Sequence, residues 1–135
     1  MGQSALPVKA DELVYLTSPA IDNVTVWNFE KNEKTGVYTV DKFSGMDGYD
    51  VFMSGAAAML VAENPNAKTD KELIIFRDSF GSSIAPLLLE NYSKITLIDS
   101  RYFASPLLGR FIEFKDQDVL FLYSTMLLNS GSILR

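Results

Sequence analysis

The sequence contains neither cysteine nor histidine among its 135 residues. The lack of cysteine excludes disulfides, thiolate nucleophiles, iron–sulfur clusters and cysteine-ligated zinc. The lack of histidine means that neither a Ser-His-Asp triad nor a histidine-ligated metal site can be completed within this chain. A serine hydrolase of the usual kind would need its base from elsewhere, and we expect no cofactor.

Positive charge and long apolar runs are also scarce. Lysine and arginine number 12 against 17 aspartates and glutamates, which gives a net charge of −5 without any basic run. Nucleic acid is therefore not an expected partner, because binding phosphates requires clustered positive charge. No run reaches the roughly 20 apolar residues that span a bilayer. The first ten residues carry no apolar stretch of signal-peptide length, and the chain alone leaves the localisation unknown.

The composition changes near Pro65. Residues 1–66 are rich in short extended runs and turns, whereas residues 67–135 alternate between apolar runs and helical patterns. With 47% hydrophobic residues, a chain of this length can bury a sizeable core. We expect either a single domain or one part of a larger domain.

The first part predicts a β-hairpin. Residues 23–30 alternate between two faces, which is typical of a strand, and the polar segment 31–36 leads to a second extended run at 37–40. Residues 56–61 fit either a helix or a strand, so the strand order stays open. Three aromatic side chains suit either stacking on a sugar or packing in the hairpin core: Trp27, Phe29 and Tyr38.

The second part predicts a β-α-β-α-β order. Apolar runs cover 73–76, 95–98 and 118–123, and helical patterns cover 82–92 and 105–114. This order implies parallel strands joined by right-handed crossovers, with helices on both faces of the sheet. The predicted fold class is therefore α/β, with a parallel three-layer core and an N-terminal hairpin region.

The segment after the first of these runs is the best candidate for chemistry. In open parallel sheets, ligands bind beyond the carboxyl ends of the strands. A hydroxyl in such a turn lies near the positive end of the next helix and near backbone N–H groups that can bind an oxyanion. We predict Ser79 as the nucleophile and Asp78 as a second catalytic residue, with Gly81 allowing a sharp turn. Serine and aspartate are also common helix caps, so a capping role stays open.

Further residues could contact the substrate or an oxyanion. The backbone N–H groups of Phe80 and Gly81 follow the serine, and Gly55 could donate another or serve only a turn. Arg77 could neutralise an anionic substrate or pair with Asp78. Arg101 follows the second run and could bind an anionic group or pair with Asp99 or another neighbouring acid.

These segments resemble the DHHW protein family. The serine block of that family resembles RDSFGSS at 77–83 with APLL at 85–88. The resemblance continues in YDVFMSG at 49–55, ENPN at 63–66, ITLIDSRY at 95–102 and DVLFLYSTMLLN at 118–129. It covers residues 49–129, and more loosely the chain from Glu12.

The family is named for an Asp-His-His-Trp motif and resembles the SGNH hydrolases, including enzymes that acetylate alginate. The resemblance implies an incomplete SGNH- or flavodoxin-like fold in a bacterial protein that is extracytoplasmic or membrane-anchored. It also implies a serine esterase or acyltransferase acting on acyl groups of the cell envelope or of polysaccharides. Ser79 would match the serine of the first SGNH block, with Arg-Asp-Ser replacing Gly-Asp-Ser. Asn129 would match the oxyanion asparagine, with a turn role left open.

The Asp-His segment that precedes the serine in the family is absent here. We therefore expect this chain to be the C-terminal portion of a longer protein, whose upstream half is its partner and supplies the base. Since a positioned base contributes about 10²–10⁴-fold, the isolated chain should be nearly inactive. Two alternatives stay open: a non-catalytic carbohydrate- or envelope-binding module in which Arg77 matters more than Ser79, and a structural half-domain that forms a homodimer through an exposed sheet edge.

Overall fold

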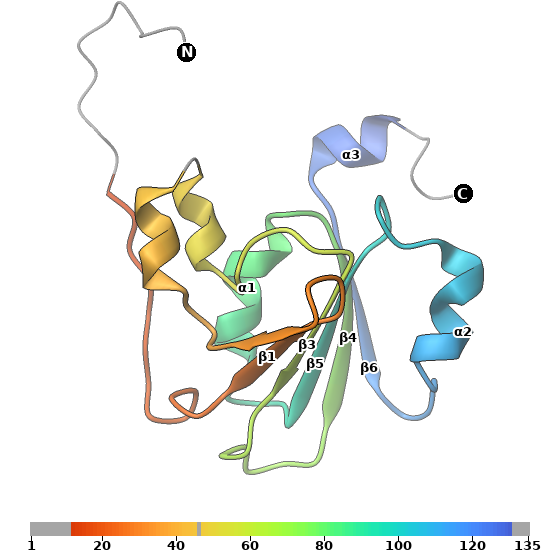
Figure 1. The fold of residues 1–135 in the computed structure, drawn as a ribbon. Coiled ribbons are helices and arrows are strands. Elements are labelled where there is room, and N and C mark those ends of the chain that lie inside the picture. Colours follow the sequence, from red (N-terminus) through yellow and green to blue (C-terminus); the bar gives the residue numbers. More distant parts are fainter. Residues whose placement is uncertain (1–11, 46, 131–135) are drawn as a thin grey trace, which may run out of the picture.

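The computed structural model describes residues 12–45 and 47–130. Six strands form one mixed sheet in the order β2-β1-β3-β5-β4-β6 (Figure 1). The strands are β1 Thr25–Asn28, β2 Glu33–Thr35, β3 Met59–Glu63, β4 Glu72–Arg77, β5 Lys94–Asp99 and β6 Asp118–Leu122. The α-helices are α1 Gly81–Leu88, α2 Leu108–Phe111 and α3 Thr125–Ser130. Three 3-10 turns complete the set: η1 Val40–Ser44, η2 Gly48–Val51 and η3 Ser105–Leu107.

The predicted β-α-β-α-β unit forms one half of this sheet. β4 lies between β5 and β6 and is parallel to both. α1 connects β4 to β5 and lies on one face, whereas η3 and α2 connect β5 to β6 and lie on the other (Figure 1). β4 and β5 are buried along almost their whole length, as continuous apolar runs in a covered parallel sheet are. The predicted α/β fold class is confirmed.

The other half of the sheet is antiparallel. β3 pairs antiparallel with β5, and β1 pairs antiparallel with both β3 and β2. The segment 56–61, which fitted either a helix or a strand, thus leads into a strand in which Leu60 and Ala62 are fully buried. The N-terminal strands therefore extend the same sheet as the C-terminal ones.

The second hairpin strand lies at β2, and the prediction of Val37–Val40 was wrong. The reason is a side chain that closes the turn early: the Asn28 Oδ1 accepts the N–H groups of Glu30 and Lys31 at 3.0 and 3.1 Å. Asparagine commonly bonds the backbone two residues on in this way. The chain therefore reverses within residues 29–32 and pairs again sooner than the polar loop suggested.

Both predicted helices are shorter than expected. α1 ends at Leu88 rather than at 92, and the segment 105–114 forms the short turns η3 and α2, which end at Phe111. Ile112 takes an extended conformation and buries its side chain against the sheet. None of the helices in the described residues is long and apolar enough to cross a bilayer.

Each face of the sheet has its own hydrophobic core. On the α1 face, Ala85 and Leu89 pack with the strand residues Leu60, Ile75 and Leu97. On the α2 face, a smaller cluster contains Met59, Ile74, Phe76, Ile98 and Ile112. Two apolar layers on opposite faces hold β4 and β5 in the middle of the molecule, and this fixes the ends of both strands.

Candidate active site

The predicted nucleophile lies in the turn between β4 and α1. β4 ends at Arg77 and α1 begins at Gly81, so Ser79 lies in a three-residue connection between them. Because β4, β5 and β6 are parallel, their carboxyl ends meet at one edge of the sheet. Ser79 is half-buried at this edge. The turn faces the end of β5 at Asp99 and the exit of β6 at Ser124.

Asp78 ties this turn to the exit of β6. Its Oδ1 accepts the Phe80 N–H at 3.1 Å, and its Oδ2 accepts the Ser124 N–H at 2.7 Å. Burial alone raises the pKa of Asp78, but the hydrogen bonds from Ser124 and Phe80 outweigh it and hold the pKa below its usual value. The carboxylate is therefore ionised at neutral pH and binds backbone on both sides. Its predicted catalytic role stays a prediction.

The backbone N–H groups after the serine are hydrogen-bonded within the turn. The Phe80 N–H donates to the Asp78 carboxylate, and the Gly81 N–H donates to the Asp78 carbonyl at 3.1 Å. The Ser82 N–H donates to the Ser79 carbonyl at 3.0 Å. An oxyanion would have to share these donors, so the predicted oxyanion roles of Phe80 and Gly81 need a small rearrangement.

Arg77 is fully buried at the end of β4. Its Nη1 donates to the Asp78 carbonyl at 3.3 Å, whereas its Nε and Nη2 have no partner among the described residues. Burial lowers the pKa of Arg77, although the neighbouring Asp99 on β5 acts in the opposite direction. The predicted contact with an anionic substrate stays a prediction, and it requires the guanidinium to become uncovered.

Gly81 provides the space for the Arg77 side chain. A Cβ at position 81 would lie 2.6 Å from the Arg77 Cβ and 3.0 Å from its Cγ. Both distances are shorter than ordinary van der Waals contact. The glycine in this turn therefore allows close packing of helix on strand, in addition to the sharp turn predicted from the sequence.

Arg101 forms an ion pair with Asp99. Its Nε and Nη2 lie 2.9 and 2.6 Å from the two carboxylate oxygens, and these hydrogen bonds raise the pKa of Arg101. Of the two interpretations from the sequence, the structure shows the pairing with an acid. Asp99 is fully buried, so its charge requires this partner.

The two remaining predicted site residues, Gly55 and Asn129, form no hydrogen bond with the serine turn among the described residues. Gly55 has φ of 91°, and a Cβ there would lie 2.5 Å from the Asp50 Oδ1. Its N–H donates to the Phe52 carbonyl at 3.0 Å, as a turn glycine would. Asn129 is exposed on α3.

Sequence reasoning missed two residues that support the turn. The Tyr49 hydroxyl lies 3.0 Å from the Phe80 carbonyl oxygen and 2.7 Å from the Ser83 Oγ, so it braces the start of α1. Ser124 donates its N–H to Asp78, as described above. The sequence could have indicated Ser124, because it lies shortly after the third parallel strand and residues at such positions meet at the carboxyl edge of the sheet.

Two of the hollows that the described residues form lie on opposite parts of the molecule. The smaller, an apolar groove of about 380 Å³, adjoins the serine turn. Its lining is Asp78, Phe80, Ser83, Ile84, Leu87, Leu122, Tyr123 and Ser124. The two chain neighbours of Ser79 line it, whereas Ser79 itself does not, so the groove adjoins the serine turn.

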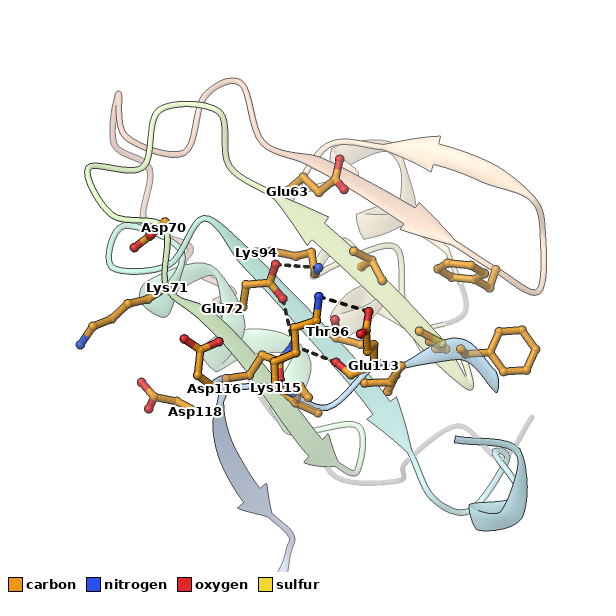
Figure 2. Close-up of a pocket in the computed structure, with 17 residues that line it drawn as sticks. Glu63, Asp70, Lys71, Glu72, Lys94, Thr96, Glu113, Lys115, Asp116 and Asp118 are labelled. Atoms are coloured by element: carbon orange, nitrogen blue, oxygen red, sulfur yellow. Dashed lines mark hydrogen bonds and ion pairs between the residues drawn. The ribbon is translucent and has the colours of Figure 1, made fainter. Parts of the chain in front are cut away.

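The larger hollow, of about 730 Å³, is polar and lies elsewhere. Figure 2 shows the ion pairs Lys94–Glu72 and Lys115–Glu113 along it, at 2.8 and 3.2 Å. β4 and β5 contribute only their amino-terminal halves to its lining, so it lies away from the serine turn. Phe29, one of the three predicted sugar-stacking aromatics, lines it and meets Trp27 edge-on. Within residues 12–45 and 47–130, no cluster of three or more carboxylates could hold a metal.

Fold and site together define an α/β protein with a serine turn at the carboxyl edge of its parallel strands. Solved structures share this fold. PatB1 from Bacillus cereus with a sulfonyl adduct is 22% identical, with a TM-score of 0.63 over 88% of this chain and 43% of that one. A second structure of PatB1 from the same organism is also 22% identical, with a TM-score of 0.57 over 77% of this chain and 35% of that one.

A DHHW family protein from Eubacterium siraeum is 25% identical, with a TM-score of 0.54 over 74% of this chain and 34% of that one. The chain thus has a DHHW-like fold and spans less than half the length of these three structures. No protein-family model and no curated protein matches the sequence.

Proposed function

We propose that this chain carries the nucleophile of an SGNH-like serine esterase or acyltransferase, with Ser79 as that nucleophile. The observation that carries the proposal is the position of Ser79, half-buried in the turn from β4 to α1 and beside an apolar groove. Two findings support it: the DHHW-like fold, and a neighbour of the same fold that holds a sulfonyl adduct. Sulfonyl reagents form such adducts with activated nucleophiles.

In the proposed reaction, the Ser79 Oγ attacks the carbonyl carbon of an ester and its proton passes to a base. The tetrahedral intermediate then expels the alcohol, which takes up a proton, and the acyl group remains on the serine. Water or the hydroxyl of an acceptor next attacks the acyl-serine and restores the free hydroxyl. The amino-terminal end of α1 points its positive dipole toward the developing oxyanion.

We propose that the base comes from outside these 135 residues. The sequence contains no histidine, and the carboxylate of the preceding residue, Asp78, already accepts two backbone N–H groups. As substrates we propose acyl esters on a polysaccharide or on the cell envelope, which the resemblance to the DHHW family implies.

Added imidazole tests this proposal because it can replace the missing base. With p-nitrophenyl acetate, we expect imidazole to raise the Ser79-dependent rate by about 10- to 100-fold, which is less than the roughly 10²–10⁴-fold of a positioned base because free imidazole is not held in place. The Ser79-dependent rate is the rate of the native chain minus that of Ser79→Ala, since imidazole itself cleaves the ester slowly. With imidazole present, an arylsulfonyl fluoride should label Ser79 in the native chain, as peptide mapping by mass spectrometry would show.

Ser105→Ala is the matched control, because Ser105 lies at the start of η3, on the opposite face of the sheet from α1. It should behave as the native chain does. Ser79→Ala should melt at the same temperature as the native chain, so that its lost rate reflects chemistry. Equal turnover by Ser79→Ala and the native chain would disprove the proposed function.

The homodimer through a sheet edge is likewise a proposal. β6 is an edge strand, and Val119 and Phe121 on it are 48% and 65% exposed. Exposed apolar edges favour pairing with a second strand. We expect the mass measured by light scattering after size exclusion to be that of a dimer, and Val119→Lys to reduce it to that of a monomer. Val40→Lys, at a valine of similar exposure in η1, should leave the dimer intact. A monomer mass for the native chain would contradict the proposal.

A further inference from the structure

The groove beside Ser79 lies between one face of α1 and the exit of β6. Ser83, Ile84 and Leu87 line it from α1, and their spacing of three and four residues places them on the same side of the helix. Leu122, Tyr123 and Ser124 line it from the opposite wall. The groove therefore starts at the carboxyl edge of the sheet and runs along α1.

The lining changes character along this path. Around the serine turn it is polar: the Asp78 carboxylate binds the Ser124 N–H, and the Ser83 hydroxyl meets the Tyr49 hydroxyl. Further along α1 it consists of apolar side chains, and Leu87 is 53% exposed. Phe80, directly after the serine, is 65% exposed. Covering these apolar side chains with an apolar ligand would remove their surface from water and so favour binding.

We propose that this groove binds the hydrocarbon tail of the acyl group that is transferred to Ser79. The inference rests on the proposed function and defines its substrate as esters of medium-chain acyl groups in preference to acetyl. The volume of about 380 Å³ falls within the usual range of ligand sites. The ionised Asp78 at the serine end disfavours a free fatty carboxylate, so the groove suits the uncharged ester.

The test is a series of p-nitrophenyl esters with imidazole present: acetate, butyrate, hexanoate and octanoate. Each added methylene that enters the groove should raise the Ser79-dependent rate constant at low substrate by about two- to fourfold. Leu87→Ser should flatten this dependence, because it removes apolar surface that a longer tail would cover. Leu87→Trp, which fills the groove, should reduce the octanoate rate more than the acetate rate.

Leu16→Ser is the matched control, since Leu16 is also an exposed leucine and lies outside the groove. It should keep the native dependence on chain length. A flat dependence in the native chain, or a steep one unchanged by both Leu87 substitutions, would overturn the groove assignment while Ser79-dependent acetate turnover still upheld the proposed function. No Ser79-dependent turnover of any ester would overturn both.

Discussion

Asp78→Ala is expected to lower the free energy of unfolding by about 2–5 kcal/mol, because it removes a buried carboxylate that accepts hydrogen bonds from two backbone donors. These donors are the N–H groups of Phe80 and Ser124, which the two carboxylate oxygens bind at 3.1 and 2.7 Å. The substitution would also free the exit of β6 from the serine turn. Urea denaturation followed by circular dichroism would measure the loss.

Asp78→Asn separates the charge from the hydrogen bonds. The amide keeps one acceptor oxygen, so we expect about half of the loss seen for Asp78→Ala at neutral pH. The pKa of Asp78 is lower in the folded chain, so the carboxylate stabilises the fold above its unfolded pKa of about 4. This stabilisation disappears as the pH falls through the lower folded pKa.

The native chain should therefore lose stability in acid faster than Asp78→Asn does, and the two unfolding curves should converge. Asp41→Asn is a suitable control, because Asp41 is exposed on η1. We expect it to change the stability and its pH dependence little. Parallel pH dependences for the native chain and Asp78→Asn would contradict the role assigned to this carboxylate.

Gly81→Ala should destabilise the chain by about 1–3 kcal/mol, the usual result of overfilling a packed site. The new Cβ would lie 2.6 Å from the Arg77 Cβ, which is fixed to the backbone of β4 and so cannot turn away as the end of a flexible side chain could. The helix or the strand end must shift instead, which displaces Ser79. Because a misplacement of about 1 Å can cost roughly 100-fold in rate, Ser79-dependent turnover should fall by more than the stability loss alone explains.

Gly109→Ala is the control, and we expect it to raise the stability of the chain. Gly109 lies in α2 and has no heavy atom within 4 Å of an added Cβ, so alanine should stabilise the chain by about 0.5–1 kcal/mol through its better helix propensity. Thermal unfolding of both variants would reveal the contrast. Similar gains for both would show that contact with Arg77 does not constrain position 81.

Local patterns predicted the parallel half of the fold well. The strands at 73–76 and 95–98 read as continuous apolar runs because both of their faces are covered. The second hairpin strand was misplaced because the Asn28 side chain closes the turn, which is a detail that polarity and length do not reveal. The segment 56–61 became a strand because β1 and β5 flank it, and those partners lie far away in the sequence.

The candidate site was predictable only in its position. The order of strands and helices places Ser79 at the carboxyl edge, and the structure has it there. The burial of Arg77 was not predictable, because arginine is rarely found without exposed surface. The hydrogen bond from Ser124 to Asp78 joins residues 46 positions apart, a separation that no local pattern reports.

The place of β5 in the sheet has a consequence during synthesis. β5 lies between β3 and β4, so it joins the antiparallel strands to the parallel ones. A ribosome releases the chain from its N-terminus, and β1, β2, β3 and β4 all emerge before residues 94–99. Until then β3 offers an unpaired side to other nascent chains. Translation that stalls just before β5 should therefore produce more aggregated product than a stall shortly after it.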